Sequence, residues 1–296
     1  MKRPFVCALA VISALSLGAC EKKAALPDAH PAAKSGAAPV ATADPLAGRM
    51  DVASSPAVVV AGKPVRLTLR LLDPATGVPL TALTAEHEKT VHLYVISADL
   101  SWFNHLHPTG PPESLSVTTV LPSPGAYQVF ADYTPQGGTR TVARANLVTE
   151  GHDPVATSIL PVIDGADAQG WIVHRVQAAP EGRPDATRGP KYAVALMPMP
   201  GKLKAGAEAM LHFEVRDSAG RPVSDLQPYL GAMGHAVILS TDAQKLLHVH
   251  PMDEGAGSPG AVAFHVTFPA PGPYKLWAQF KHGGLIMTAP FVLSVE

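Results

Sequence analysis

One histidine pattern occurs twice in the sequence, and this repeat constrains the fold more than any other feature. In the first copy, His92 is followed after twelve residues by His105-Leu106-His107-Pro108. In the second copy, His235 is followed after twelve residues by His248-Val249-His250-Pro251. A spacing that persists while most neighbouring residues differ indicates a geometric requirement. We therefore expect two related units, each of which holds three histidines in a fixed relation.

The similarity between the two units extends well beyond the histidines. Both copies share an Ala-Gly turn followed by an apolar run, a Pro-Gly-x-Tyr segment, a Gly-Gly turn and a final apolar run. The corresponding segments are Ala61–Leu71 and Ala205–Val215, Pro124–Ala131 and Pro271–Ala278, and Gly137-Gly138 and Gly283-Gly284. Order and spacing agree across about ninety residues, which predicts an internal duplication.

Each unit consists of short apolar runs separated by Gly, Pro, Asp and Ser residues. The strands expected in the first unit are Leu67–Leu72, Val91–Ser97, Leu115–Leu121, Tyr127–Tyr133 and Thr141–Val148. No stretch has a helical period over the length that a helix needs. Regularly spaced short strands with turn residues between them favour a β-sandwich. We therefore predict an all-β protein with two tandem β-sandwich domains.

The N-terminus has the pattern of a targeting segment. Lys2 and Arg3 precede an apolar run, Phe5–Leu17, which is shorter than the roughly 20 residues that a membrane-spanning helix needs. The run ends in Leu17-Gly18-Ala19-Cys20, which resembles the bacterial lipobox. The resemblance implies a signal peptide over residues 1–19 and lipid attached to Cys20. The alternative is an ordinary secretory peptide with an incidental cysteine.

The expected domain organisation follows from these segments. Residues 20–47 are rich in Ala, Pro and Lys and are predicted to form a lipid-anchored flexible tether. Residues 48–150 form the first predicted domain and residues 191–296 the second. Residues 151–190 are predicted to be a linker with extra strands at Ile159–Ile163 and Trp171–Val176. We expect the protein to face the periplasm from the cell envelope, at the outer membrane if the host is Gram-negative.

Cysteine content and charge exclude several functions. Cys7 leaves with the signal peptide and Cys20 would carry lipid, so the folded body has no thiol. This excludes a cysteine nucleophile and a blue-copper centre, which requires a thiolate ligand. The net charge of −1 gives no indication of a nucleic-acid partner. No Ser-His-Asp arrangement, phosphate loop or paired-carboxylate signature is evident, so we do not expect an enzyme.

A hairpin can bring the three histidines of each copy together. Side chains alternate across a strand, so His105 and His107 share a face. If Ala98–Ser101 is a four-residue loop, Trp102 pairs with Ser97 and His92 falls opposite His107, with His105 on the same face. Opposed Cβ atoms are about 5 Å apart, close enough for two imidazoles to share an ion. The equivalent register sets His235 opposite His250, with His248 beside them.

The residue types favour copper or zinc at these sites. Three imidazoles without a thiolate suit Cu²⁺ or Zn²⁺. Met233, Met252 and Met287 in the second unit add thioethers, which select Cu(I), so copper is the preferred ion there. The first unit has no methionine in the corresponding places. Its histidines are predicted to bind Cu²⁺ or Zn²⁺, or to be only the structural counterpart of the second set.

The segment Leu226–His235, followed by His248-Val249-His250-Pro251, resembles a family of exported bacterial proteins. These are the YtkA-like and CopC-like copper-associated domains, and the resemblance implies an Ig-like or cupredoxin-like β-sandwich. It also implies that copper is bound or delivered outside the cytoplasm. The expected partners are the membrane, through the N-terminal lipid, and periplasmic metal-handling proteins. Two alternatives remain open. One is an Ig-like envelope adaptor with structural histidines, and the other is a cupin-type metalloenzyme suggested by Glu254 after His248-x-His250.

Overall fold

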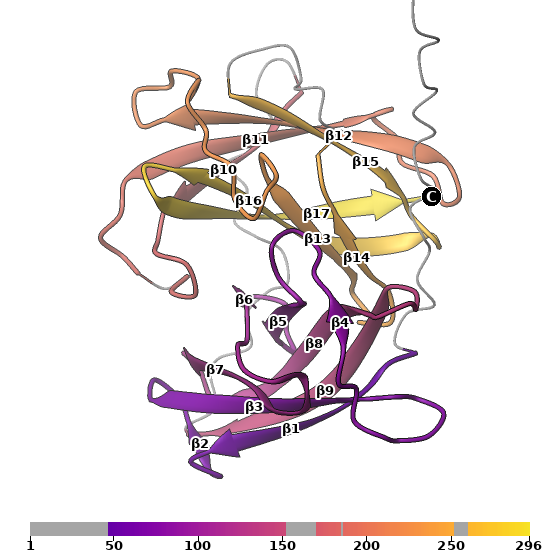
Figure 1. The fold of residues 1–296 in the computed structure, drawn as a ribbon. Helices are drawn as coiled ribbons and strands as arrows, with labels where there is room; N and C mark the ends of the chain where they lie inside the picture. Colours follow the sequence, from indigo (N-terminus) through magenta and orange to yellow (C-terminus); the bar gives the residue numbers. More distant parts are fainter. Residues whose placement is uncertain (1–46, 152–169, 185, 252–259) are drawn as a thin grey trace, which may run out of the picture. The chain divides into compact units, whose positions relative to one another are not determined.

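The computed structural model describes residues 47–151, 170–184, 186–251 and 260–296 (Figure 1). The predicted signal peptide, Cys20 and the tether up to residue 46 lie outside these residues, as do Ile159–Ile163, Met252 and Glu254. Within them, the only helical segment is a single 3-10 turn, Pro112–Ser114. No helix of the described part is long and apolar enough to cross a membrane. The prediction of an all-β chain with an internal repeat is confirmed.

The first repeat forms two antiparallel sheets. One sheet has the order β1-β3-β7, and the other has the order β2-β9-β8-β5-β6, with β4 paired to β8 (Figure 1). The strands are β1 (Arg49–Ser55), β2 (Val59–Val60), β3 (Pro64–Leu72), β4 (Leu83–Thr84), β5 (Val91–Ser97), β6 (Phe103–Leu106), β7 (Leu115–Val120), β8 (Gly125–Pro135) and β9 (Thr141–Glu150). The short strand β2 pairs in parallel with β9. The five strands expected from the sequence are all present, and β6 is the second strand of the expected histidine hairpin. Strands β1, β2 and β4 are additional.

The second repeat also forms two four-stranded sheets. Their orders are β10-β11-β12-β15 and β14-β13-β16-β17 (Figure 1). The strands are β10 (Ile172–Gln177), β11 (Lys191–Met199), β12 (Glu208–Asp217), β13 (His235–Ser240), β14 (Leu246–Val249), β15 (Ala261–Thr267), β16 (Gly272–His282) and β17 (Leu285–Val295). Strand β10 coincides with the extra strand expected at Trp171–Val176. Because it pairs with β11, this part of the expected linker belongs to the second sandwich.

Alternating apolar residues explain why each repeat closes into a sandwich. In β3, Leu67, Leu69 and Leu71 are fully buried, whereas Arg66 before them and Arg70 between the last two are exposed. The same alternation occurs along β12, where Leu211 and Phe213 lie in the second core. One face of each sheet therefore packs against the other sheet of its own domain.

Strands β5 and β13 differ from β3 and β12 because side chains on both of their faces are buried. Along β5, Leu93 and Val95 pack in the first core, whereas Tyr94 and Ile96 join a separate cluster with residues of the second repeat. That cluster contains Val237 and Leu239 of β13, together with Phe103, Phe130, Leu246 and Trp277. Phe103 and Trp277 stack with their ring centroids 4.8 Å apart. Both repeats belong to one compact unit, Pro39–Glu296. The second faces of β5 and β13 thus form an apolar interface between the two domains.

Candidate metal centre

The hairpin register expected from the sequence is confirmed in both repeats. In the first, the amide of Ser97 donates to the carbonyl of Trp102 across the four-residue loop, and Tyr94 pairs with His105. In the second, Val237 pairs with His248. Continued by two residues, these registers place His92 opposite His107 and His235 opposite His250. Each repeat therefore brings its three histidines to one place, on the face of the strand that meets the other domain.

In the first triad, hydrogen bonds to the outer ring nitrogens fix which nitrogens face inward. His92 Nε2 lies 3.1 Å from the carbonyl oxygen of Glu86, and His105 Nδ1 lies 2.8 Å from Oε1 of Gln279. His107 Nδ1 lies 2.7 Å from Oε1 of Glu181. Each of these partners is an acceptor, so each outer nitrogen carries the proton. The inward nitrogens are His92 Nδ1, His105 Nε2 and His107 Nε2, and in a neutral ring each has only a lone pair.

The second triad repeats this arrangement at two of its three rings. His235 Nε2 donates to the carbonyl of Tyr229 at 2.7 Å, and His248 Nδ1 lies 3.0 Å from Oδ2 of Asp132. The inward nitrogens of these two rings are His235 Nδ1 and His248 Nε2, 3.3 Å apart. Nε2 of His250 lies 3.0 Å from Nε2 of His248. The carbonyls of Glu86 and Tyr229 both precede the first histidine of their triad by six residues, so this contact is part of the repeat.

The inward nitrogens of each triad are placed as the ligands of one ion would be. In the first triad, His105 Nε2 lies 3.1 Å from His92 Nδ1 and 3.1 Å from His107 Nε2. All inward atoms of a triad lie within 4.8 Å of one another. Two imidazole nitrogens bound to a tetrahedral Zn²⁺ are about 3.3 Å apart, given bond lengths near 2 Å. Lone pairs that converge without a proton between them repel, and a cation removes this repulsion. The donor set therefore fits a metal ion.

Burial keeps five of the six rings in the neutral form that metal binding requires. Desolvation, followed by the charge of His107, lowers the pKa of His92 to about 4. Desolvation also lowers the pKa of His235 to about 3 and that of His250 to about 2. The pKa values of His105 and His248 are lowered well below the ordinary value for the same first reason. At these five histidines, no competing proton has to be displaced at neutral pH.

Each domain supplies a supporting group to the triad of the other. Gln279 pairs with His235 between β16 and β13, yet its side chain accepts the hydrogen bond of His105 in the first domain. Asp132 pairs with His92 between β8 and β5, yet its carboxylate accepts the hydrogen bond of His248 in the second domain. Asp132 and Gln279 occupy equivalent positions of the repeat. The support is therefore reciprocal. The supporting group is a carboxylate at the second triad and an uncharged amide at the first.

The surroundings of Asp132 reinforce this difference between the sites. Arg140 makes a two-pronged contact with its carboxylate, with Nε–Oδ1 and Nη2–Oδ2 distances of 2.9 and 2.6 Å. The same guanidinium donates to the backbone carbonyl of His248 at 3.2 Å. In contrast, the amide of Gln279 donates to Thr288 at 3.0 Å. Such outer hydrogen bonds orient ligand rings and set their basicity, so the two triads have different electronic environments.

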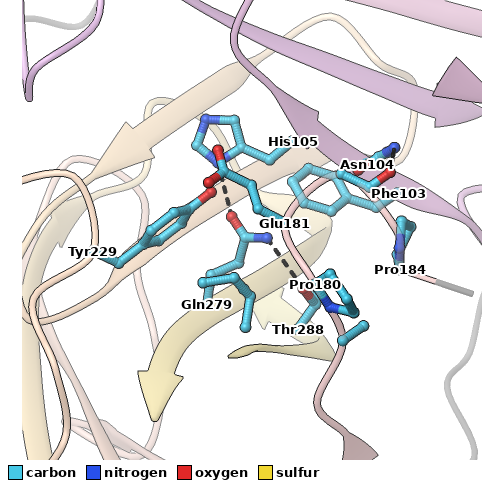
Figure 2. A pocket seen from close by; sticks show the side chains of 12 residues that line it. Phe103, Asn104, His105, Pro180, Glu181, Pro184, Tyr229, Gln279 and Thr288 are labelled. Atoms are coloured by element: carbon cyan, nitrogen blue, oxygen red, sulfur yellow. Dashed lines mark hydrogen bonds between the residues drawn. The ribbon is translucent and has the colours of Figure 1, made fainter. Parts of the chain in front are cut away.

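A small cavity adjoins the first triad (Figure 2). Its volume of about 20 Å³ is enough for about one water molecule. His105, Glu181, Tyr229 and Gln279 lie along one part of its wall, and Pro180 and Pro184 along another. The segment that carries Glu181 thus lies beside the triad, although the sequence predicted only a linker there. The His107 hydrogen bond lowers the pKa of Glu181, which keeps this carboxylate charged.

His87 is a residue that sequence reasoning missed. It lies in the turn before β5 with a positive φ of 47° and stacks on His250 of the second domain, with ring centroids 3.6 Å apart. Leu230 holds the equivalent position in the second repeat, also at a positive φ, of 52°. Since the equivalent residue is not a histidine, the repeat gave no signal for His87. Asp132, Gln279 and Glu181 were missed because only the contact between domains brings them to the triads.

Of the three methionines expected as copper ligands, Met233 and Met287 lie among the described residues. Met287 is fully buried in the core of the second domain and pairs with Phe280 between strands. Met233 is 40% exposed, whereas the histidines that follow it are buried or half-buried. The described residues thus supply six histidines as candidate ligands, while a role for Met233 stays a prediction.

Comparisons with known proteins give a family but no activity. No curated protein matches the chain. Among solved structures, it is similar to the Escherichia coli adhesin FdeC, at 16% identity with a TM-score of 0.24 over 83% of this chain and 64% of that one. It is also similar to dimeric latent PorU from Porphyromonas gingivalis, at 10% identity with a TM-score of 0.30 over 85% and 34% of the two chains. The chain thus spans less than two thirds of either structure, and similarities this weak carry no information about the site.

A match to a protein family covers both repeats. The family is described as "Domain of unknown function (DUF8832)", and the match extends over residues 44–150 and 187–296. Each of the two segments contains one complete histidine triad together with the residue that supports the triad of the other segment. The chain therefore belongs to the DUF8832 family.

Proposed function

We propose that this protein binds copper in the cell envelope through its two histidine triads and buffers or delivers it there. The observation that carries the proposal is the convergence of three inward nitrogens in each triad. Outer hydrogen bonds turn the lone pair inward at all three rings of the first triad and at His235 and His248 of the second. Histidines that serve only the fold would be expected to satisfy their inward nitrogens with donors. Here, the inward neighbours of each nitrogen are other imidazole nitrogens.

Copper is preferred over zinc on chemical grounds. Sites built from nitrogen ligands follow an order of affinity in which Cu²⁺ exceeds Zn²⁺. Imidazole also binds Cu(I), so the same triads suit both oxidation states, and a thioether from Met233 would favour the reduced ion at the second site. The resemblance of Leu226–His235 to copper-associated exported domains supports the same ion. Zinc remains the main competitor, because three histidines are also a frequent zinc ligand set.

The cellular place of this activity follows from the lipobox-like N-terminus. Lipid on Cys20 would hold the protein at the envelope membrane, and residues 20–47 would let the folded body reach other periplasmic metal-handling proteins. Metal release to such a protein needs an accessible ligand. His250, the last histidine of the second triad, is half-buried. The side chain of His107, at the equivalent place in the first triad, is only 5% exposed, and the other four histidines are buried. His250 is therefore the ligand that an acceptor protein would reach first.

Metal titration of the compact unit Pro39–Glu296 tests the proposal. We expect two equivalents of copper to be retained after gel filtration and desalting, and none after the combined substitutions His105→Ala and His248→Ala. A matched control is His265→Ala, since His265 lies in an exposed pair with Glu208 away from both triads. Retention of neither copper nor zinc by the folded wild type would reject metal binding and favour an envelope adaptor with structural histidines. Retention of zinc in preference to copper would reject the choice of ion.

A further inference from the structure

The two triads lie as close to each other as the rings within one triad do. Within the triads, His92 and His105 have ring centroids 5.3 Å apart, and His235 and His248 have centroids 5.5 Å apart. Between the triads, the His92 and His248 centroids are 4.9 Å apart. The His105 and His235 centroids are 6.1 Å apart. The six rings thus form one continuous cluster at the domain interface.

This packing limits how far apart two bound ions can be. A metal ion lies about 3 Å from the centroid of an imidazole that binds it, given a metal–nitrogen bond near 2 Å. Because His92 and His248 are 4.9 Å apart, ions held by these two rings are separated by at most roughly 11 Å. The four central rings are buried, so little water screens the ions from each other.

The nearby carboxylates do not cancel the charge of two divalent ions. Asp132 supports His248, but Arg140 already neutralises it, and Gln279 at the equivalent position is uncharged. Glu181, which accepts the hydrogen bond of His107, is half-exposed at 50%. The repulsion between two ions scales with the product of their charges, which is four times larger for two Cu²⁺ ions than for two Cu⁺ ions.

We propose that the six histidines form one dinuclear metal centre in which occupancy of one triad weakens binding at the other, much more for Cu(II) than for Cu(I). This inference rests on the proposed function, because it requires that the triads bind metal. It predicts that the centre holds two Cu(I) ions with similar affinity but takes up a second Cu(II) ion reluctantly. The reciprocal bonds of Gln279 and Asp132 would make each triad sensitive to the state of the other.

Stepwise titration of the full chain tests the coupling. With Cu(II), we expect the second equivalent to bind at least tenfold more weakly than the first, and with Cu(I) we expect a difference several-fold smaller. The single-site variants His107→Gln and His250→Gln, which each remove the last histidine of one triad, serve as references. Each should bind one Cu(II) ion with an affinity close to that of the first ion in the wild type. Far-ultraviolet circular dichroism and thermal unfolding of each variant confirm that it is folded.

Electron paramagnetic resonance provides an independent measurement on the same samples. Wild type loaded with two Cu(II) ions should show a dipolar interaction that corresponds to a separation of at most roughly 11 Å, absent from both single-site variants. Two ions that bind with equal affinities and give additive spectra would overturn the dinuclear centre but leave metal binding intact. Failure of the wild type and both variants to bind either ion would instead reject the proposed function.

Discussion

At the scale of single residues, the structure gives Asp132 a role that the sequence did not predict. Its carboxylate accepts a hydrogen bond from Nδ1–H of His248, which turns Nε2 of that ring toward the other histidines of the triad. Removal of such an outer partner of a metal-bound histidine commonly lowers metal affinity by 10- to 100-fold. We expect Asp132→Asn to lower the copper affinity of the second triad by this factor and that of the first triad much less.

Isothermal titration in the His107→Gln background measures the second triad alone and so checks this prediction. A suitable control is Asp51→Asn, because Asp51 forms an exposed ion pair with Arg70 on β1 and β3. An affinity for copper that is unchanged in Asp132→Asn would mean that His248 is positioned by its strand and not by the carboxylate. The fold of this variant needs separate confirmation, because Arg140 loses its acidic partner.

Met233 tests the contribution of a thioether. If its side chain reaches the ion at the second triad, Met233→Leu should lower Cu(I) affinity about tenfold and leave Cu(II) affinity unchanged, because thioethers select the softer ion. Met233 is 40% exposed, so the substitution should have little effect on stability. Met199, which is 45% exposed at the end of β11, offers a matched control in Met199→Leu. Equal Cu(I) affinities in all three proteins would leave the triads as all-histidine sites.

At the scale of elements, loop length determines which way the histidines face. A four-residue loop pairs Ser97 with Trp102, and alternation then places His105 and His107 beside His92. A shift of one residue would turn both to the opposite face. We expect insertion of one glycine after Leu100 to abolish the first site, so that copper stoichiometry falls from two ions to one.

The matched control for this insertion is one glycine added between Gly137 and Gly138, at the turn between β8 and β9. This turn carries no ligand, so two ions should still be bound. If the insertion after Leu100 left the stoichiometry at two, the extra residue would have been absorbed as a bulge. Metal analysis after desalting reports the stoichiometry in both variants.

This dependence on local pairing explains how much of the site the sequence predicted. The strands, the hairpin register and the meeting of three histidines follow from alternation, turn residues and the repeat, all of which are local properties. The supporting groups Asp132, Gln279 and Glu181 do not, because they reach the triads across the domain interface. The double burial of β5 and β13 was a usable signal, since apolar residues on both faces of a strand indicate a second partner. Val91–Ser97 and His235–Ser240 both show it.

At the scale of the whole molecule, the duplication creates the site, because both triads lie where the two repeats meet. Each domain presents to the other the sheet that carries its histidines, and Phe103 stacks on Trp277 in the apolar part of the interface. A set of buried imidazoles therefore lies in the contact that holds the domains together. Protonation of these rings must affect the stability of the whole compact unit as well as metal binding.

The sign of this effect follows from the pKa values. Burial lowers the pKa of His92 to about 4 and that of His235 to about 3, below the ordinary imidazole value of 6.5. At a pH between 6.5 and the lowered pKa values, these histidines are protonated in the unfolded chain but neutral in the folded chain. The free energy of unfolding therefore falls as pH drops below 6.5, by up to about 1.4 kcal/mol per pH unit for each such histidine. We expect the apo protein to lose thermal stability steeply between pH 6.5 and pH 4.

The copper affinity of the buried triads should depend on pH less than the affinity of an exposed histidine site. If the histidines had the ordinary imidazole pKa, copper affinity would decrease between pH 7 and pH 5, because the ligands must be neutral to bind the ion. The lowered pKa values of His235, His248 and His250 keep the folded second triad neutral through this range, so we expect its intrinsic affinity to change less than threefold while the protein remains folded. Thermal unfolding with and without copper, together with titrations at pH 7, 6 and 5, checks both statements. A tenfold loss of affinity at pH 5 in a protein that is still folded would show that the triads open to solvent and that their burial does not protect the ligands.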